Sequence, residues 1–259
     1  MSKQYISETL TKICKLYPPE LVEHMRRDIE RMEFHIGLAM EGRSIETVQE
    51  LSVCDLGGGN TLFSVGFAAF GVKRSILVDD LSDPDNDWIF ENDTSPHAHY
   101  GVQIFQRDLL QHGLDGIEDQ LDVVTCFNSM EHWHNSPKKL FAEVFSKLRA
   151  GGKFILSAPN GVNLRKRITV PFGRGKWSAL DDWYESERFR GHVREPDVED
   201  IVCIARSMGL IDLKVLGRNW SGYYSQKPLI RAMTVIADQP LRLFPTLCAD
   251  IYVVGRKPG

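Results

Sequence analysis

The sequence places an acid next to a glycine run in a way that favours a particular kind of ligand. Asp55 lies two residues before Gly57–Gly59, at the end of an apolar stretch. Glycines tolerate positive φ angles and let a ligand come close to the backbone. Neither GxGxxG nor GxxxxGK[ST] is present, and no lysine follows to hold a phosphate. Because a carboxylate repels a pyrophosphate and attracts a cation, this turn predicts a cationic ligand.

A second acid strengthens this interpretation. Asp79 lies twenty residues after Gly59, at the end of the next apolar run, where an acid can accept both hydroxyls of a ribose. Asp80 is adjacent and remains an alternative for the same role. S-adenosylmethionine carries an ammonium, a sulfonium and a ribose but no phosphate, so it fits this set of residues.

Two further polar groups follow later strands of the same pattern. Asp108 and Leu109 come after a short strand, where the carboxylate suits an adenine amino group and the leucine suits the ring edge. Asn128 and Ser129 follow a long apolar strand that is expected to end at the same crevice. Each of these signals is weak alone, and they gain weight from their order along the chain.

Histidines are the candidates for acting on a methyl acceptor. A hydroxyl acceptor benefits from a general base, usually worth ~10²–10⁴ in rate, whereas an amine or thiolate needs little more than alignment. We expect His192 to act as general base or acceptor-orienting group, with His134 as the second candidate. The competing interpretation makes His192 a surface residue that caps the next helix. The pair Glu131-His132 is expected to be structural.

No metal site is expected from the sequence. His97 and His99 form one HxH pair, and His132 and His134 form another. Neither pair has a carboxylate or cysteine at a matching ligand spacing.

Two segments stand outside the regular pattern of the chain. Residues 164–176 are basic within an acidic protein and are followed by Trp177, which predicts either a solvated loop or a lid that holds an anionic acceptor. Residues 228–247 are apolar with interspersed arginines and prolines. We expect them to pack on the sheet or on another subunit, with a membrane surface as the alternative. The oligomeric state is not predicted.

Alternating strand and helix patterns position these residues. Apolar spacing predicts a helix over 20–40, and then strands and helices alternate. The expected strands are 51–56, 75–78, 102–105, 121–127 and 153–158, with further candidates at 210–216 and 251–254; the expected helices are 61–70, 137–148 and 197–208, and 82–100 reads as loop. Such alternation predicts an α/β fold with a parallel sheet covered on both faces.

The pattern also suggests how the chain is divided. Residues 1–50 form an N-terminal helical extension, and residues 51–259 form the main domain, which includes a lid or acceptor segment at 160–195 and an excursion at 218–248.

Composition narrows the class of protein further. The chain has 259 residues, 42% hydrophobic and 25% charged, with a formal net charge of −4. A mildly acidic chain without nucleic-acid-binding motifs disfavours a nucleic acid as partner. Its five cysteines are scattered, as is usual in a reducing compartment. With no signal peptide and no long apolar run, the expected location is the cytoplasm.

Together the motifs resemble a known family. The stretches DLGGG at 55–59, LVDD at 77–80, RDL at 107–109, LDVVTCFNSMEHW at 121–133 and LRAGGKFILSAPN at 148–160 resemble a class I S-adenosylmethionine-dependent methyltransferase of the broad type-11 group. The resemblance covers about residues 50–160. It implies a Rossmann-like, doubly wound, seven-stranded sheet whose last strand is antiparallel.

The resemblance also implies roles for individual residues. The turn at Gly57, Gly58 and Gly59 would hold the methionine part of the cofactor, Asp79 the ribose and Asp108 the adenine, with Asn128 and Ser129 lining the floor of the site. It says little about the acceptor, which we expect to be a small molecule, a sugar or a carrier-linked group, methylated on oxygen or nitrogen.

Two other functions compete with this one. A nicotinamide oxidoreductase uses a similar sheet, but the missing GxGxxG motif argues against it. A non-catalytic member of the fold that serves as an interaction module is disfavoured because Asp55, Asp79 and Asp108 are all present.

Overall fold

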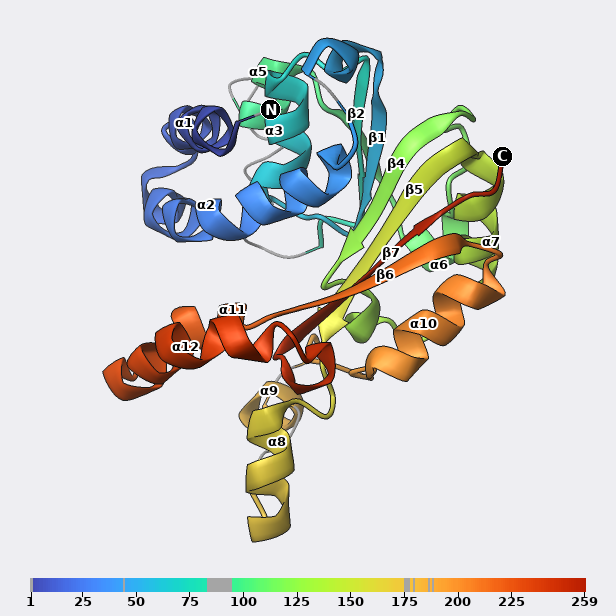
Figure 1. Ribbon diagram of the computed structural model, residues 1–259. Helices are drawn as coiled ribbons and strands as arrows, with labels where there is room; N and C mark the ends of the chain where they lie inside the picture. Colours follow the sequence, from blue (N-terminus) through green and yellow to red (C-terminus); the bar gives the residue numbers. More distant parts are fainter. Residues whose placement is uncertain are drawn as a thin grey trace. The chain divides into compact units, whose positions relative to one another are not determined.

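The computed structural model describes residues 2–43, 45–82, 95–174, 178, 180–185, 187 and 189–259. Its seven-stranded sheet has the order β3-β2-β1-β4-β5-β7-β6 (Figure 1). The strands are β1 Ser52–Leu56, β2 Arg74–Asp79, β3 Gln103–Gln106, β4 Leu121–Phe127, β5 Leu148–Pro159, β6 Ile211–Arg218 and β7 Asp250–Arg256. β1 pairs in parallel with β2 and β4, whereas β6 and β7 are antiparallel. The predicted fold class is confirmed.

The chain groups into two compact units, and each is described by itself. The first unit contains residues 1–126 and 139–154 with residue 259, and the second contains residues 127–138 and 155–258. In the first unit, β1 is buried along its whole length and β4 up to Cys126. Strands buried on both faces explain why these sequence stretches are continuously apolar and do not alternate.

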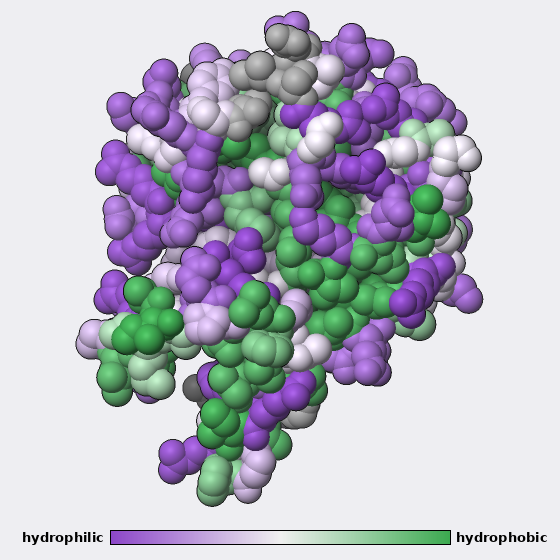
Figure 2. All heavy atoms as spheres, in the orientation of Figure 1, coloured by the Kyte–Doolittle hydropathy of each residue, from purple (hydrophilic) through white to green (hydrophobic). Residues whose placement is uncertain are grey.

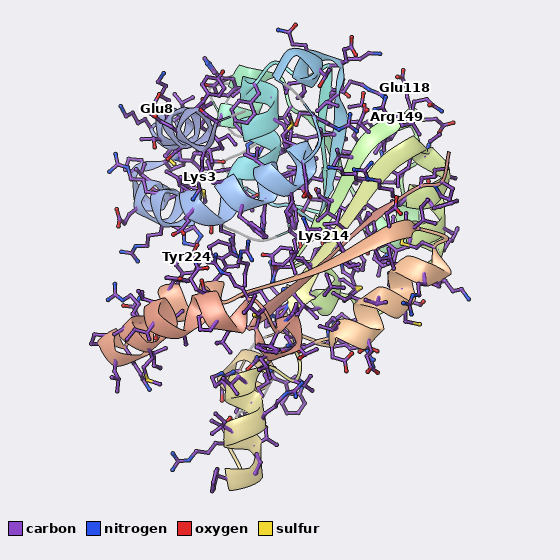
Figure 3. All side chains as sticks on the ribbon, in the orientation of Figure 1. Lys3, Glu8, Glu118, Arg149, Lys214 and Tyr224 are labelled. Carbon is purple, nitrogen blue, oxygen red and sulfur yellow. The ribbon has the colours of Figure 1, made fainter. Side chains whose placement is uncertain are left out.

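Besides its strands, the first unit contains a set of helices. They are α1 Lys3–Cys14, α2 Pro19–Met40, η1 Ile45–Glu50, α3 Leu62–Ala69, α5 Pro96–Tyr100, α6 Leu109–His112 and most of α7 Lys138–Lys147. α3 packs on β1 and β2, and α1 and α2 pack on α3 (Figure 1). Gly66 permits this close approach, because a Cβ there would lie 3.1 Å from Leu10 Cδ2 and 3.2 Å from Ile36 Cδ1. Lys3, labelled in Figure 3, also forms an ion pair with Glu33 of α2.

A buried lysine fixes the carboxyl end of α2. Lys153 on β5 is 3% exposed, and its Nζ donates to the carbonyl oxygens of Leu38 and Ala39, both at 3.3 Å, and of Glu41 at 2.5 Å. The last carbonyls of a helix have no partner within the helix and carry partial negative charge, so a cation is stabilising there. Near the start of the same strand, Arg149, labelled in Figure 3, pairs with the buried Asp122 of β4.

The second unit contains the antiparallel pair and the remaining helices. They are η3 Met130–His132, α8 Leu164–Thr169, η4 Val170–Phe172, α9 Leu180–Tyr184, α10 Val198–Ser207, α11 Trp220–Tyr223, α12 Pro228–Leu241 and η5 Pro245–Leu247. α10 packs on β6 and β7. Its first residue follows Asp197, which forms a capping box with Asp200. This local signal explains why the sequence predicts the helix within one residue at each end.

Three expectations need correction. The strand expected at 153–158 begins already at Leu148, directly after the helix that ends at Lys147, so Gly151 and Gly152 lie inside β5. The stretch 82–100, expected to be loop, contains α5 at its end, while 83–94 lies outside the described residues.

The third correction concerns 228–247. This segment forms α12 and η5, of which η5 contacts strand β6 as expected, whereas α12 contacts α11. Asp238 is the buried residue of α12, whereas its apolar side chains, such as Ile236 at 78%, are largely exposed. Figure 2 shows hydrophobic side chains at the surface over α8 and α12. Among the described residues, no helix combines the length and apolar character needed to cross a membrane.

The Lys153 contact gives a stability prediction. Lys153→Met should lower the free energy of unfolding by about 2–4 kcal/mol, because buried carbonyl acceptors lose their donor while the aliphatic volume is kept. Urea unfolding followed by circular dichroism measures the change. Lys139→Met, at an exposed position of α7, is the matched control and should change stability by less than about 0.5 kcal/mol. Equal effects of the two substitutions would contradict the assignment.

Candidate functional site

The glycine turn has the conformation that its sequence requires. β1 ends at Leu56, and the chain then turns with φ angles of 68° at Gly57 and 52° at Gly59. Gly57 N donates to Val78 O of β2 at 2.8 Å. A Cβ at Gly58 would collide with Asp55 Oδ2, so only glycine fits above that carboxylate. The turn and the preceding acid are therefore packed as one piece.

Asp55 is a buried acid with one direct hydroxyl partner. The residue is 1% exposed, and Thr125 Oγ1 of β4 donates to its Oδ1 at 2.6 Å. Burial raises the pKa of Asp55 to about 7, the Thr125 hydrogen bond opposes this rise, and the nearby Asp79 carboxylate adds to it. A cation that comes close to this group would stabilise the charged form of the carboxylate.

The structure distinguishes Asp79 from Asp80. Asp79 Oδ2 accepts a hydrogen bond from Gly59 N at 2.9 Å, and its Oδ1 accepts one from Leu81 N at 2.7 Å. Asp80 is exposed, and its Oδ1 accepts from Ser82 N. Asp79 is therefore the acid that lies against the glycine turn.

Tyr17 is a residue of this region that no sequence motif indicates. It lies between α1 and α2, is buried, and donates its hydroxyl to Asn60 O at 2.9 Å. This contact joins the helical extension to the residue that follows the glycine run. Local patterns cannot mark it, because the two residues are 43 positions apart.

Asp108 and Leu109 lie at the start of a short helix. Asp108 is the N-cap of α6, and its Oδ1 accepts from Leu110 N at 2.8 Å and from Gln111 N at 3.1 Å. Its Oδ2 accepts from Gln111 Nε2 at 3.0 Å. The capping contacts thus use the carboxylate that the sequence assigned to adenine, while Leu109 beside it is buried.

Asn128 and Ser129 lie near the start of the second unit. Asn128 has a positive φ of 48°, and its Oδ1 accepts from Ser157 Oγ at 2.9 Å. Ser129 is buried. The positive φ turns the chain sharply where β4 ends, and asparagine tolerates this conformation better than most residues.

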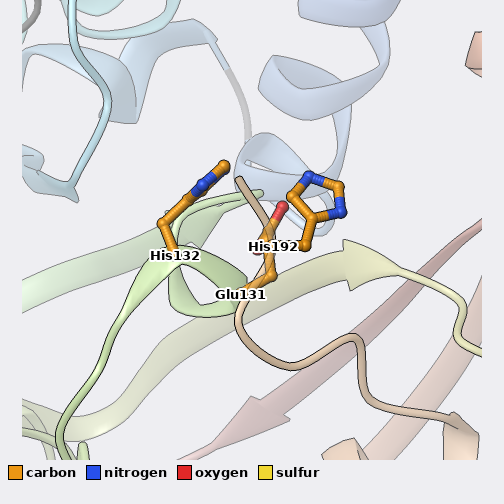
Figure 4. A group of neighbouring side chains, drawn as sticks. All are labelled: Glu131, His132 and His192. Atoms are coloured by element: carbon orange, nitrogen blue, oxygen red, sulfur yellow. The ribbon is translucent and has the colours of Figure 1, made fainter. Parts of the chain in front are cut away.

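Glu131, His132 and His192 come together in the second unit (Figure 4). One ligand atom from each lies within 4.8 Å of the other two. Backbone contacts hold the two segments side by side, because Val193 N donates to Glu131 O at 2.7 Å and His132 Nδ1 lies 2.8 Å from Arg190 O. The rings of the two histidines are T-shaped at a centroid distance of 4.9 Å.

His192 is held by a buried acid. Its Nδ1 lies 2.7 Å from Glu195 Oε1, and Glu195 also pairs with Lys166 of α8. Burial, followed by the neighbouring His132 and Lys166, lowers the pKa of His192 to about 4. The imidazole is therefore neutral at ordinary pH. Glu195 is a near neighbour of His192 in the sequence, whereas the sequence alone does not indicate that Lys166 lies beside this pair.

The other acceptor-side candidates lie apart from this group. His134 is exposed and is not a member of it. In the basic segment, Arg165 is exposed, whereas Arg167 donates to Val162 O at 2.6 Å and supports the backbone. Lys166 is buried. Residues 175–177, including Trp177, lie outside the described residues.

Comparisons with known proteins define the family. A family model described as a methyltransferase domain matches residues 20–214. The chain therefore belongs to the methyltransferase-domain family, and it is a class I S-adenosylmethionine-dependent methyltransferase, as the sequence motifs predicted. This membership decides against the nicotinamide oxidoreductase and the non-catalytic module. A search of the curated proteins finds no match.

Solved structures share the fold at low identity. A methyltransferase from Archaeoglobus fulgidus has a TM-score of 0.52 at 17% identity, covering 91% of this chain and 97% of its own. A putative sarcosine dimethylglycine methyltransferase from Galdieria sulphuraria has a TM-score of 0.56 at 16% identity, covering 89% and 88%. Phosphoethanolamine N-methyltransferase 2 of Haemonchus contortus, solved with S-adenosyl-L-methionine, has a TM-score of 0.51 at 16% identity, covering 82% and 49%.

The raised pKa of Asp55 predicts a pH dependence of stability. Its pKa rises from 3.8 to about 7 on folding, so the folded protein binds the proton more tightly than the unfolded chain. The free energy of unfolding should therefore fall as pH rises from about 4 to 7, and Asp55→Asn should remove this loss. At pH 8 we expect the variant to be more stable than the wild type, by on the order of 2–4 kcal/mol.

Chemical denaturation of the ligand-free protein at pH 5 and pH 8 measures this difference. Asp115→Asn, at an exposed position, is the matched control and should follow the wild type. An Asp55→Asn variant that loses stability equally at both pH values would contradict the prediction.

Proposed function

We propose that this methyltransferase binds S-adenosylmethionine at the glycine turn of the first unit and methylates a small or carrier-linked acceptor that bears an anionic group. The observation that carries the proposal is the packing of Asp55 and Asp79 around Gly57–Gly59, with Asp55 Oδ2 directly under Gly58 and Asp79 Oδ2 at 2.9 Å from Gly59 N. Two acids and no basic group at the turn suit a cationic nucleoside.

Each residue of the turn has a distinct proposed role. The backbone of Gly57, Gly58 and Gly59 lies against the methionine part, and the Asp55 carboxylate beneath it attracts the positive charge of the ligand. Asp79, which lies against the glycine turn, accepts the ribose hydroxyls in preference to Asp80. Asp108 and Leu109 contribute to the adenine end, where the capping role of Asp108 fixes the position of its carboxylate.

For this reaction the protein needs mainly to align the acceptor atom with the methyl group and to exclude water. A lone pair of the acceptor oxygen or nitrogen forms a bond to the methyl carbon, the bond from that carbon to sulfur breaks, and the sulfur keeps the electron pair. The products are the methylated acceptor and S-adenosylhomocysteine, and a hydroxyl or ammonium acceptor also releases a proton. Because the methyl group is already activated by the sulfonium, proximity supplies much of the rate.

The basic segment supports an anionic acceptor. Arg165 is exposed on α8 within a run of cationic residues, and a guanidinium pairs well with phosphate or carboxylate. The Haemonchus contortus enzyme, 14% identical in this comparison, was solved with phosphomonomethylethanolamine, an acceptor that carries a phosphate. Small acceptors of this chemical type are the first to test. A panel of amines and alcohols with and without a phosphate or carboxylate, incubated with labelled cofactor, identifies the acceptor by product mass.

The cofactor assignment predicts different effects at the two adjacent acids. Asp79→Asn should weaken binding of S-adenosylhomocysteine by about 10- to 100-fold, because charge-assisted hydrogen bonds are worth ~1.5–3 kcal/mol. Asp80→Asn is the matched control and should stay within about twofold of the wild type. Isothermal titration calorimetry measures both, and a thermal melt checks folding, because Asp79 also supports Gly59. If Asp80→Asn gives the larger loss, the two acids have been assigned in the wrong order.

The acceptor assignment predicts a separate effect on α8. Arg165→Glu should raise the KM for the anionic acceptor found by the panel about tenfold or more and leave cofactor affinity unchanged. Arg167 is unsuitable for this test, because it supports the backbone of Val162. Lys139→Glu, on α7, controls for net charge. A fall in cofactor affinity with an unchanged acceptor KM would reverse the proposed roles of the two regions.

A further inference from the structure

The carboxyl group of Glu131 is buried without a full set of partners. Glu131 is 1% exposed, and among the described residues no donor reaches its Oε2. A buried oxygen with no donor costs free energy unless a ligand occupies the space beside it.

Two imidazoles lie beside this carboxylate with their Nδ1 atoms already engaged. His132 Nδ1 lies 2.8 Å from Arg190 O, and His192 Nδ1 lies 2.7 Å from Glu195 Oε1. Both partners are acceptors, so each ring carries its proton on Nδ1 and keeps the Nε2 lone pair for another group. A histidine oriented by a carboxylate or carbonyl in this way is the usual support of a metal-ligating imidazole.

We propose that Glu131, His132 and His192 form a binding site for a divalent first-row transition metal ion of the Zn²⁺ class. The ligand atoms lie within 4.8 Å of one another, and small side-chain rotations would bring them to the ~2.0–2.2 Å bonds of a shared ion. Two neutral imidazoles and one carboxylate suit Zn²⁺, Co²⁺ or Fe²⁺ better than Mg²⁺ or Ca²⁺, which prefer oxygen ligands.

Further contacts hold the three proposed ligands in place. Glu195 holds His192 and is itself paired with Lys166, which reduces the charge that Glu195 would otherwise add next to the ion. Glu131 O accepts from Val193 N and Arg194 N, so the loop that carries His192 is fastened to the residue that supplies the carboxylate.

Three protein ligands leave positions open for another group. An ion with open positions binds an oxygen of a substrate and promotes the loss of its proton. In this protein that oxygen would belong to the acceptor, a step that rests on the proposed function, whereas metal binding does not. As a metal ligand, His192 differs from a general base, because its Nε2 would donate its lone pair to the ion and would not receive a proton.

Metal binding can be measured on the full chain without any acceptor. After treatment with chelator and removal of the chelator, the protein is titrated with Co²⁺ and followed by visible absorption, and then with Zn²⁺ by calorimetry. We expect one ion for each chain, with Co²⁺ bands of a mixed nitrogen and oxygen site. Glu131→Gln, His132→Asn and His192→Asn should each weaken binding by about 100-fold or more, and Glu195→Gln by about tenfold.

Matched controls decide between this site and adventitious binding. His134→Asn changes an exposed neighbouring histidine outside the group and should leave affinity within about twofold. Melting curves in the presence of chelator report whether each variant folds. If Glu131→Gln does not fold, the two histidine variants carry the test. Binding that is absent in the wild type, or unchanged in both histidine variants, overturns the proposal.

Three further measurements separate this proposal from the proposed function. S-adenosylhomocysteine binding by the chelated wild type tests the glycine turn alone, and Asp79→Asn should leave Co²⁺ binding intact. Once an acceptor is known, His132→Asn and His192→Asn should both lower kcat, and added Zn²⁺ should restore activity to the chelated wild type and not to the variants. Activity that depends on His192 but not on His132 or Glu131 would favour a lone general base and overturn the metal site.

Discussion

The packing of the buried Asp55 carboxylate under Gly58 is the constraint on which the candidate cofactor site depends. Because a Cβ at position 58 would collide with Asp55 Oδ2, the acid and the glycine specify each other. Thr125 of the neighbouring strand β4 orients the carboxylate, and Asp79 of β2 holds the end of the same turn through Gly59 N. Adjacent parallel strands thus converge on one loop, which is where ligands bind in open α/β sheets.

Much of the sheet could be predicted because its strands are continuously apolar and end at distinctive residues. The predicted bounds of β4 are those that the structure shows, since its run of buried residues lies between polar neighbours. The acid and glycine at the end of β1 are equally clear. The predicted boundary between α7 and β5 is wrong, because Gly151 and Gly152 resemble a helix stop and yet lie within a strand that continues through a positive φ at Gly151.

Long-range contacts could not be predicted, because no local pattern encodes them. The sequence indicates a structural role for Glu131-His132, and the approach of this pair to His192 depends on backbone hydrogen bonds to a loop about sixty residues later. The burial of Lys166 against Glu195 is likewise hidden, since a run of arginines and lysine indicates a solvated face. The apolar composition of 228–247 predicts a packed segment, but the apolar side chains of α12 are largely exposed.

Because Lys153 binds the last carbonyls of α2, the chain cannot be shortened at the start of the sheet without loss of these contacts. Residues 1–50 read as an extension that precedes the main pattern, yet Lys153 and Tyr17 tie them to β5 and to the start of α3. A shortened chain that starts at residue 51 would leave an ammonium group in an apolar interior with its carbonyl partners gone. Residue 51, where the recognisable motifs start, is therefore not the boundary of a unit that unfolds cooperatively. Hydrogen exchange in α2 should accordingly report on the stability of the sheet.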